Sequence, residues 1–337
     1  MSTARAKKSA NGARHQPGNA RTSRPPLRLL VALDGATARA NAPIDTAVAL
    51  MKANRARVEA VSVIDPLAAA QLTVGMPVAV AGEAALRGEQ RQRRLELRQF
   101  LADRTDARRP WPVRVALGTP ANAILDAARG ADLVIMGLRR ERLIERIIHD
   151  ATTPHVVRES AVPVLAVTPD LRGMPRTVVV AVDFSPESKA AARLACTLFT
   201  GCARLVLVHI ESDFDAAIAN LDEITKMVRE NGWAGAFQRL LDTLPVPAGA
   251  TVETAVVRGT VPKTLIAFAK RRGADVLVVA RQRHDLAERV LVGTVTAGLV
   301  RRAPCSLLIT PAEWRGPAHA SPVRRTRARR TPTGTLP

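Results

Sequence analysis

The sequence predicts an α/β protein of two doubly wound domains in tandem, each built on a five-stranded parallel sheet. Three observations lead to this fold class. The chain has 337 residues and 47% hydrophobic content, which is enough to bury two cores. It contains two copies of a unit roughly 140 residues long. Each copy alternates short β-branched runs with longer amphipathic segments, which is typical of a parallel sheet covered by helices.

The repeat is visible when the sequence is aligned with itself. "LLVALDGA" aligns with "VVVAVDFS", and "ERLIERIIHDA" aligns with "HDLAERVLVGT". In the central part of the unit the offset is 143 residues, so Asp132 aligns with Asp275 and Arg140 with Arg283. The match covers most of the chain between its two ends. The chain is therefore the product of a duplication.

Ten runs rich in Val, Ile and Leu are the expected strands. They lack polar alternation, which indicates strands buried on both faces. Right-handed crossovers then make a doubly wound sandwich the most economical topology. In the first unit the runs are 28–33, 57–63, 112–117, 132–136 and 163–167; in the second they are 177–182, 204–210, 251–257, 275–279 and 306–310.

Charge and composition set the domain boundaries. We expect a disordered basic tail at 1–26, domains at 27–170 and 171–312, and a second basic tail at 313–337. Of the net charge of +20, six charges come from the first tail and five from the residues after Pro311. Such tails can make loose contacts with nucleic acid, an anionic membrane surface or an acidic protein, or can simply keep the chain soluble.

Ligands of doubly wound sheets lie beyond the carboxyl ends of the strands, where the strand order reverses. In a flavodoxin-like order the first and fourth strands of each unit are neighbours. The loops carrying Asp34 and Gly137 then face each other in the first unit, and those carrying Asp183 and Ala280 do so in the second. The sequence therefore predicts a ligand site at each of these two places.

Several repeated motifs together resemble the universal stress protein family. They are V-A-[LV]-D after the first strand, G-T before the third helix, A-D-[LV]-[LV]-[IV] at the fourth strand and R-x-A-P-C before the last. The resemblance implies an adenine nucleotide alpha hydrolase-like fold. It also implies ATP as a cofactor, bound by an Asp after the first strand and a G-x-x-G-x9-G-[ST] stretch, whose glycines let backbone N–H groups approach phosphates.

In the first unit the glycine-rich pattern is degraded. Gly137 holds the first glycine position, but Arg140 replaces the second glycine, Asp150 the third and Ala151 the hydroxyl residue. An aspartate at the phosphate position repels the ligand. The first unit is therefore expected to be structural or to bind a partner.

In the second unit half of the pattern remains. The candidate nucleotide-binding residues that the resemblance implies are Asp183, Ala280, Arg283, Gly293 and Thr294. One interpretation is that Arg281, Arg283 or Arg289 neutralises the phosphates through its side chain. The other is that the side chains at 280 and 283 fill the space that a nucleotide needs.

Other polar residues have structural interpretations beside functional ones. Asp183 in "DFSPES" can cap the following helix instead of binding a ligand, and His209 is expected to be packed or hydrogen-bonded. The basic stripe of one expected helix is interleaved with glutamates, which favours a solvated face; it consists of Arg87, Arg91, Arg94 and Arg98.

The remaining patterns argue against catalysis and metal binding. No catalytic signature and no metal-ligand spacing occurs, and Cys196, Cys202 and Cys305 form no CxxC pair, which favours a reducing compartment. Aromatic content of 3% without tyrosine lacks the stacking surface of a single-strand binder. No apolar stretch is long enough to span a membrane.

These features predict a cytoplasmic, stress-response regulatory protein that binds an adenine nucleotide in its second domain. The resemblance to the universal stress protein family also implies that the two units pack as an intramolecular pseudo-dimer through their last strands, which would cover two sheet edges; whether two chains assemble further stays open. One alternative is a scaffold that binds nucleic acid or an acidic protein through its tails. A third is slow ATP hydrolysis or phosphotransfer that uses Thr294.

Overall fold

A computed structural model describes residues 26–66, 83–106, 108–138, 152–211, 223–282, 289–314 and 316, with side chains left out for 223–231 and 289–295. The expected second tail at 313–337 begins too early, because Trp314 is described and packs against the core. Residues 1–25 and 317–337 and the loop containing Arg140, Asp150 and Ala151 lie outside the described residues, as does Arg283. The expectations that concern them remain predictions.

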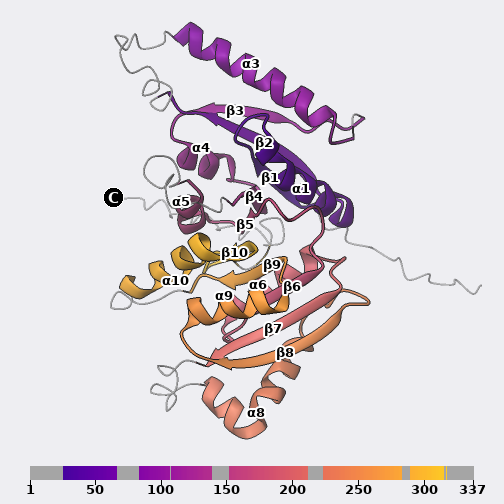
Figure 1. Cartoon of the computed structure of the whole chain (residues 1–337), viewed down its shortest axis with the longest axis vertical. Coiled ribbons are helices and arrows are strands. Elements are labelled where there is room, and N and C mark those ends of the chain that lie inside the picture. The colour runs from indigo at the N-terminus through magenta and orange to yellow at the C-terminus, as the bar shows by residue number, and fades with distance from the viewer. Residues whose placement is uncertain are drawn as a thin grey trace, which may run out of the picture.

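Ten strands form one sheet in the order β3-β2-β1-β4-β5-β10-β9-β6-β7-β8 (Figure 1). Within each unit all neighbouring strands are parallel, and the order is the flavodoxin-like one. The strands are β1 (Arg28–Ala32), β2 (Arg57–Ile64), β3 (Val113–Leu117), β4 (Leu133–Gly137), β5 (Val164–Val167), β6 (Thr177–Ala181), β7 (Arg204–Glu211), β8 (Thr251–Arg258), β9 (Val276–Ala280) and β10 (Ser306–Thr310). The predicted fold class is confirmed.

The helices cover both faces of this sheet. One face carries α1 (Asn41–Asn54), α3 (Glu83–Ala102), α6 (Pro186–Leu198) and α8 (Glu223–Leu241), and the other carries α4 (Pro120–Ala127), α5 (Thr152–Glu159), α9 (Val261–Arg272) and α10 (Arg289–Arg302). A short 3-10 helix, η1 (Ala38–Ala40), precedes α1. Proline in the first turn marks the start of α4, α6 and α9, where its missing N–H costs nothing.

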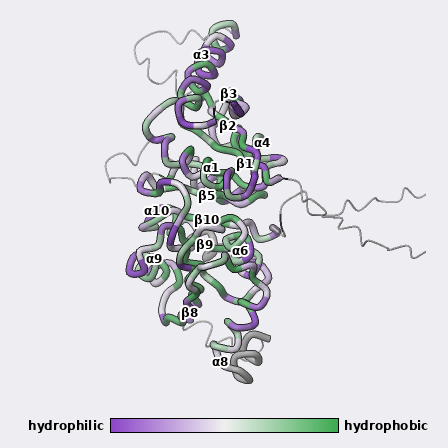
Figure 2. Tube along the Cα trace, turned by 90° about the vertical axis from the view of Figure 1, so that its right-hand side faces the viewer, coloured by the Kyte–Doolittle hydropathy of each residue, from purple (hydrophilic) through white to green (hydrophobic). Residues whose placement is uncertain are grey.

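Two apolar layers form the core, one on each face of the sheet, and both run through the two units. Residues of β1 and β4 share one layer with residues of β6 and β9, and the layer on the opposite face does the same. Figure 2 shows the hydrophobic residues concentrated along the strands, between the helices. The two units are therefore joined by a common core as well as by a common sheet.

The junction between the units is the antiparallel pair of β5 and β10, with Leu165 opposite Leu308. The 143-residue offset of the repeat makes these two leucines equivalent, so a pseudo-twofold axis passes between them. At the edge of the junction the Thr168 N–H donates to Ser306 Oγ at 3.0 Å. The predicted pairing of the units through their last strands is confirmed.

Among the described helices, none has the length and apolar character that a membrane span requires.

Candidate ligand sites at the carboxyl ends of the strands

The repeated A-D motif lies at the amino ends of the strands, away from the predicted ligand sites. Asp275 Oδ2 accepts hydrogen bonds from the N–H groups of Arg176 and Thr177, both at 2.8 Å. In the first unit Asp132 Oδ2 accepts the N–H of Arg28 at 2.8 Å. In both units the aspartate before the fourth strand thus ties that strand to the start of the first, and its role is structural.

Asp183 follows β6 and organises the start of α6. Its Oδ1 accepts the Ser185 N–H at 3.0 Å and the Ser185 hydroxyl at 2.5 Å. Ser185 Oγ in turn accepts the Ser188 N–H at 3.2 Å, as the N-cap of α6. The expected cap is therefore present, but Ser185 forms it, and Asp183 acts by holding Ser185 in place. These hydrogen bonds occupy one oxygen of a half-buried carboxylate, and the other oxygen remains for a ligand.

An aromatic cluster lies beside Asp183 at the carboxyl ends of β6 and β7. Phe184, in the left-handed region at φ 63°, is buried and has its ring centroid 5.5 Å from His209 and 6.0 Å from Trp233. The His209 and Trp233 centroids are 4.4 Å apart. His209 is buried, with Nδ1 2.8 Å from the Val182 carbonyl oxygen. The expectation of a packed, hydrogen-bonded histidine is confirmed.

Trp233 reaches this cluster because α8 is interrupted just before it. Gly232 has φ 66° and ψ 175°, which is outside the helical region. An L side chain rarely adopts such a φ, so glycine is the residue suited to this position. The break leaves Trp233 half-buried against Phe184 and His209.

The side chain of Arg281, directly after β9, does not lie where a phosphate-binding role would place it. The Arg281 guanidinium donates to the carbonyl oxygens of Val157 at 3.1 Å and Ser160 at 2.7 Å, and also to that of Arg158. These carbonyls belong to the carboxyl end of α5 in the first unit. The interpretation of Arg281 as a phosphate-neutralising residue is wrong, because the junction turns its side chain toward the helix end. Burial lowers the pKa of Arg281, and the nearby Glu159 carboxylate opposes this shift.

The backbone of α10 places the last part of the candidate phosphate stretch. The helix begins at Arg289, so Gly293 and Thr294 lie in its second turn. Ala280 is the last residue of β9, next to β6 in the sheet. The structure thus brings Asp183 and Ala280 to adjacent strand ends, with Gly293 and Thr294 one turn into the helix that follows.

The corresponding place in the first unit is described in part. Gly137 ends β4, and its carbonyl accepts the Thr153 hydroxyl of α5 at 3.3 Å. Asp34 is exposed, and the following Gly35 is buried, at φ 71°. The two units therefore differ directly after their first strands, where the first has glycine and the second has the phenylalanine of the aromatic cluster.

A comparison with protein families gives two matches on this chain. The universal stress protein family matches residues 27–168 and, separately, residues 174–311. The chain belongs to the universal stress protein family. The resemblance inferred from the repeated motifs is thereby confirmed.

Two solved structures share the fold of most of this chain. A universal stress protein from Archaeoglobus fulgidus DSM 4304 is 17% identical with a TM-score of 0.58; the alignment covers 85% of this chain and 98% of that one. A protein of unknown function from Pseudomonas aeruginosa PAO1 is 14% identical with a TM-score of 0.54, over 85% of this chain and 92% of that one. At these identities the likeness concerns the fold. No curated protein matches the chain.

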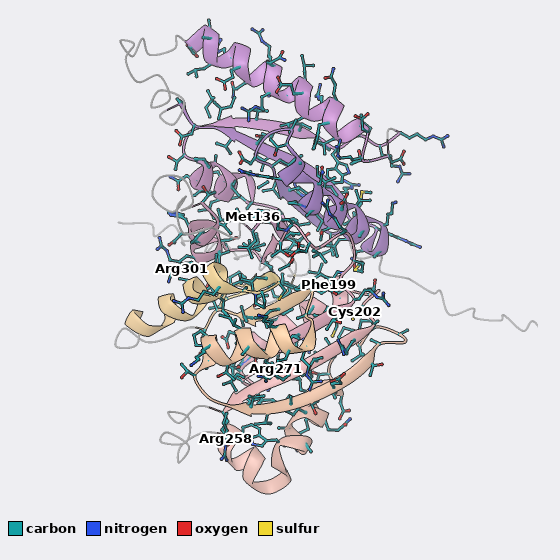
Figure 3. All side chains as sticks on the ribbon, viewed as in Figure 1. Met136, Phe199, Cys202, Arg258, Arg271 and Arg301 are labelled. Carbon is teal, nitrogen blue, oxygen red and sulfur yellow. The ribbon has the colours of Figure 1, made fainter. Side chains whose placement is uncertain are left out.

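The three cysteines of this universal stress protein are buried and form no disulfide. Cys196 lies on α6, and Cys202 lies just beyond the end of that helix, close to Phe199 (Figure 3). Burial raises the pKa of Cys196 to about 12. Within the described ranges no three His, Cys, Asp or Glu side chains are grouped as metal ligands would be.

Proposed function

We propose that this universal stress protein is a stress-response regulator that binds an adenine nucleotide in its second unit. Family membership supports the stress-response role, and universal stress protein domains often bind nucleotides. Proteins of this family are generally non-catalytic, so the proposed activity is ligand-dependent regulation. The proposed binding residues are Asp183, Ala280, Arg283, Gly293 and Thr294.

The observation that carries this proposal is the adjacency of β6 and β9. The two strands pair in parallel, with Val180 opposite Val278, so the loops that follow them leave the sheet side by side. Asp183 stands at the start of one loop and Ala280 ends the strand before the other. In the proposed complex the partial positive charge at the amino end of α10, which follows this second loop, attracts the phosphate groups.

The aromatic cluster beside Asp183 favours a ligand that contains an aromatic base. Trp233 is half-buried, and its indole stacks on Phe184 with an interplanar angle of 24°. An adenine ring placed against this surface gains stacking and apolar contact. In the proposed complex Asp183 Oδ2 accepts a hydrogen bond from a ribose hydroxyl, since both hydrogen bonds from Ser185 go to Oδ1.

The test is thermal unfolding of the full chain with and without millimolar ATP, ADP and AMP, each with magnesium. A ligand at 100 times its dissociation constant stabilises the native state by about 2.7 kcal/mol, which raises the melting temperature by a few degrees. Gly293→Asp, which copies the Asp150 of the first unit, should abolish the shift, because its carboxylate repels phosphate.

The matched control is Gly88→Asp. Gly88 lies in α3 of the first unit, and an added Cβ there meets no atom within 4 Å, so the same helical glycine-to-aspartate change is made away from the proposed site. This variant should keep the full nucleotide shift. Absence of a shift with all three nucleotides, or equal loss in both variants, would refute nucleotide binding in the second unit.

A further inference from the structure

Two positions that carry aromatic side chains in the second unit carry smaller residues in the first. The strand register pairs Ala32 with Val61 and, in the second unit, Ala181 with Val208. Ser62 is therefore the counterpart of His209. Gly35 is likewise the counterpart of Phe184, because "LDG" aligns with "VDF" directly after the first strand. The first unit thus has a glycine and a serine where the second has a phenylalanine and a histidine.

Ser62 is a buried hydroxyl with no partner among the described residues. Its relative exposure is 1%, and its Oγ makes no hydrogen bond in the described part of the chain. The neighbours two residues away on the strand, Ala60 and Ile64, belong to the apolar layer under α1 and α3, so Ser62 points to the same face. An unpaired buried hydroxyl is costly, and native proteins normally satisfy it with water or a ligand.

Helix α3 carries two arginines on the side that faces the sheet next to this serine. The Gln90 side-chain amide donates to the Val115 carbonyl at 3.0 Å, and Val115 is the register partner of Ser62 on β3. Figure 1 shows α3 lying along β3. Arg93 and Arg94 follow Gln90 by three and four residues, so they share its inward face.

The Arg93 guanidinium lies near the end of β1. Its Nη1 is 3.4 Å from the position that a Cβ at Gly35 would take, so the guanidinium lies against this glycine. Arg94 is half-buried, and its Nε has no hydrogen-bond partner in the described residues. The expectation that Arg94 belongs to a solvated basic stripe is wrong, whereas Arg87, Arg91 and Arg98 are exposed as expected.

We propose that the first unit binds the phosphate group of a small molecule between α3 and the carboxyl ends of β1 and β2. Arg93, Arg94 and Ser62 are the donors. Two guanidiniums and a hydroxyl offer the charge and the number of donors that suit a phosphate dianion better than a carboxylate. The neighbouring Asp34 is exposed. This site uses other residues than the glycine-rich pattern and is independent of the nucleotide site proposed for the second unit.

The test is calorimetric titration of the full chain with inorganic phosphate and, separately, with glycerol 3-phosphate, at constant ionic strength. We expect saturable binding of one phosphate per chain. Arg93→Gln and Ser62→Ala should each weaken it by about tenfold or more, the loss expected for one charge-assisted or buried hydrogen bond. Tighter binding of inorganic phosphate would identify the free ion as the ligand, and tighter binding of glycerol 3-phosphate a phosphomonoester.

Two control variants distinguish this site from a merely basic helix surface and from the second unit. Arg98→Gln removes an exposed arginine of the same helix and should leave binding unchanged; an equal loss would mean non-specific attraction to a basic helix and would overturn the proposal. Gly293→Asp should also leave phosphate binding unchanged. Loss of binding in Gly293→Asp, with retention in Arg93→Gln, would place the anion in the second unit instead.

Thermal unfolding without phosphate gives a second readout for Ser62. Ser62→Ala removes the unpaired buried hydroxyl without adding an atom to the packed face, so it should leave the melting temperature unchanged or raise it while weakening phosphate binding. A lower melting temperature would show that the hydroxyl is satisfied by the protein, and would overturn its assignment as a ligand donor. No saturable binding of either probe to the unsubstituted chain would overturn the proposal as a whole.

Discussion

Replacing Arg281 with leucine removes a guanidinium that spans the junction between the two units. In the native chain it donates to three carbonyl oxygens at the end of α5, including that of Ser160 at 2.7 Å. These carbonyls have no partner within their own helix, so the guanidinium both satisfies them and places positive charge at the negative end of the helix dipole. The substitution therefore removes hydrogen bonds and a favourable charge together.

The magnitude follows from these contacts. Hydrogen bonds from a charged donor contribute about 1.5–3 kcal/mol, and a partly buried cation at a helix end up to about 2 kcal/mol. Desolvation of the guanidinium, which also lowers its pKa, offsets part of this gain, and water can reach the exposed end of α5 in the variant. We expect Arg281→Leu to lower the free energy of unfolding by about 2–3 kcal/mol.

Urea denaturation followed by circular dichroism measures this loss. The neighbouring Gln282→Leu is the matched control, because Gln282 is exposed and should change stability by less than about 0.5 kcal/mol. Arg281→Lys keeps the charge but loses the forked donor geometry, and should fall between the two. A loss in Arg281→Leu no greater than in Gln282→Leu would refute the capping role.

Three further predictions concern a strand tie, a helix cap and a buried thiol. Asp275→Ala should lower the free energy of unfolding by about 2–3 kcal/mol in urea, because two backbone N–H groups lose their acceptor; an unchanged midpoint would contradict this role. Ser185→Ala should cost about 1 kcal/mol through loss of the N-cap of α6, and a larger loss in thermal unfolding would mean that the Asp183 loop also rearranges. Cys196, with its pKa raised by burial from 9.0 to about 12, should resist a thiol reagent at pH 8 until urea is added, and rapid labelling of the native chain would contradict its burial. Because the pKa is higher in the folded chain, this thiol favours folding fully below pH 9 and loses that effect as the pH approaches 12.

The strands could be predicted from sequence because each is a compact apolar run. All ten begin and end within one residue of the expected positions, and the family resemblance implied that the last strands pair. Runs of this kind depend only on local residue type, since both faces of each strand are buried. The helix start after Asp183 could likewise be predicted from the Ser-Pro pair, although the cap is Ser185 and Asp183 only supports it.

The contacts that cross the junction could not be predicted in the same way. Arg281 lies in a loop where family resemblance suggested a phosphate, and its actual partners are more than 120 residues away in sequence. Only the antiparallel pairing of β5 with β10 brings the end of α5 within its reach. The burial of Arg94 could not be predicted either. Its spacing matches an exposed stripe, but α3 is rotated so that Arg94 turns inward with Gln90.

The pseudo-twofold axis between Leu165 and Leu308 also bears on how this molecule can change. In a dimer of identical subunits every mutation appears on both sides of the axis, so a cation gained at one helix end is gained at both. Here Arg281 stands on one side, and its counterpart on the other is the buried Leu138. Fusion has released the two halves from this constraint. Each can acquire its own ligand chemistry by single substitutions, while the shared sheet keeps their geometry in common.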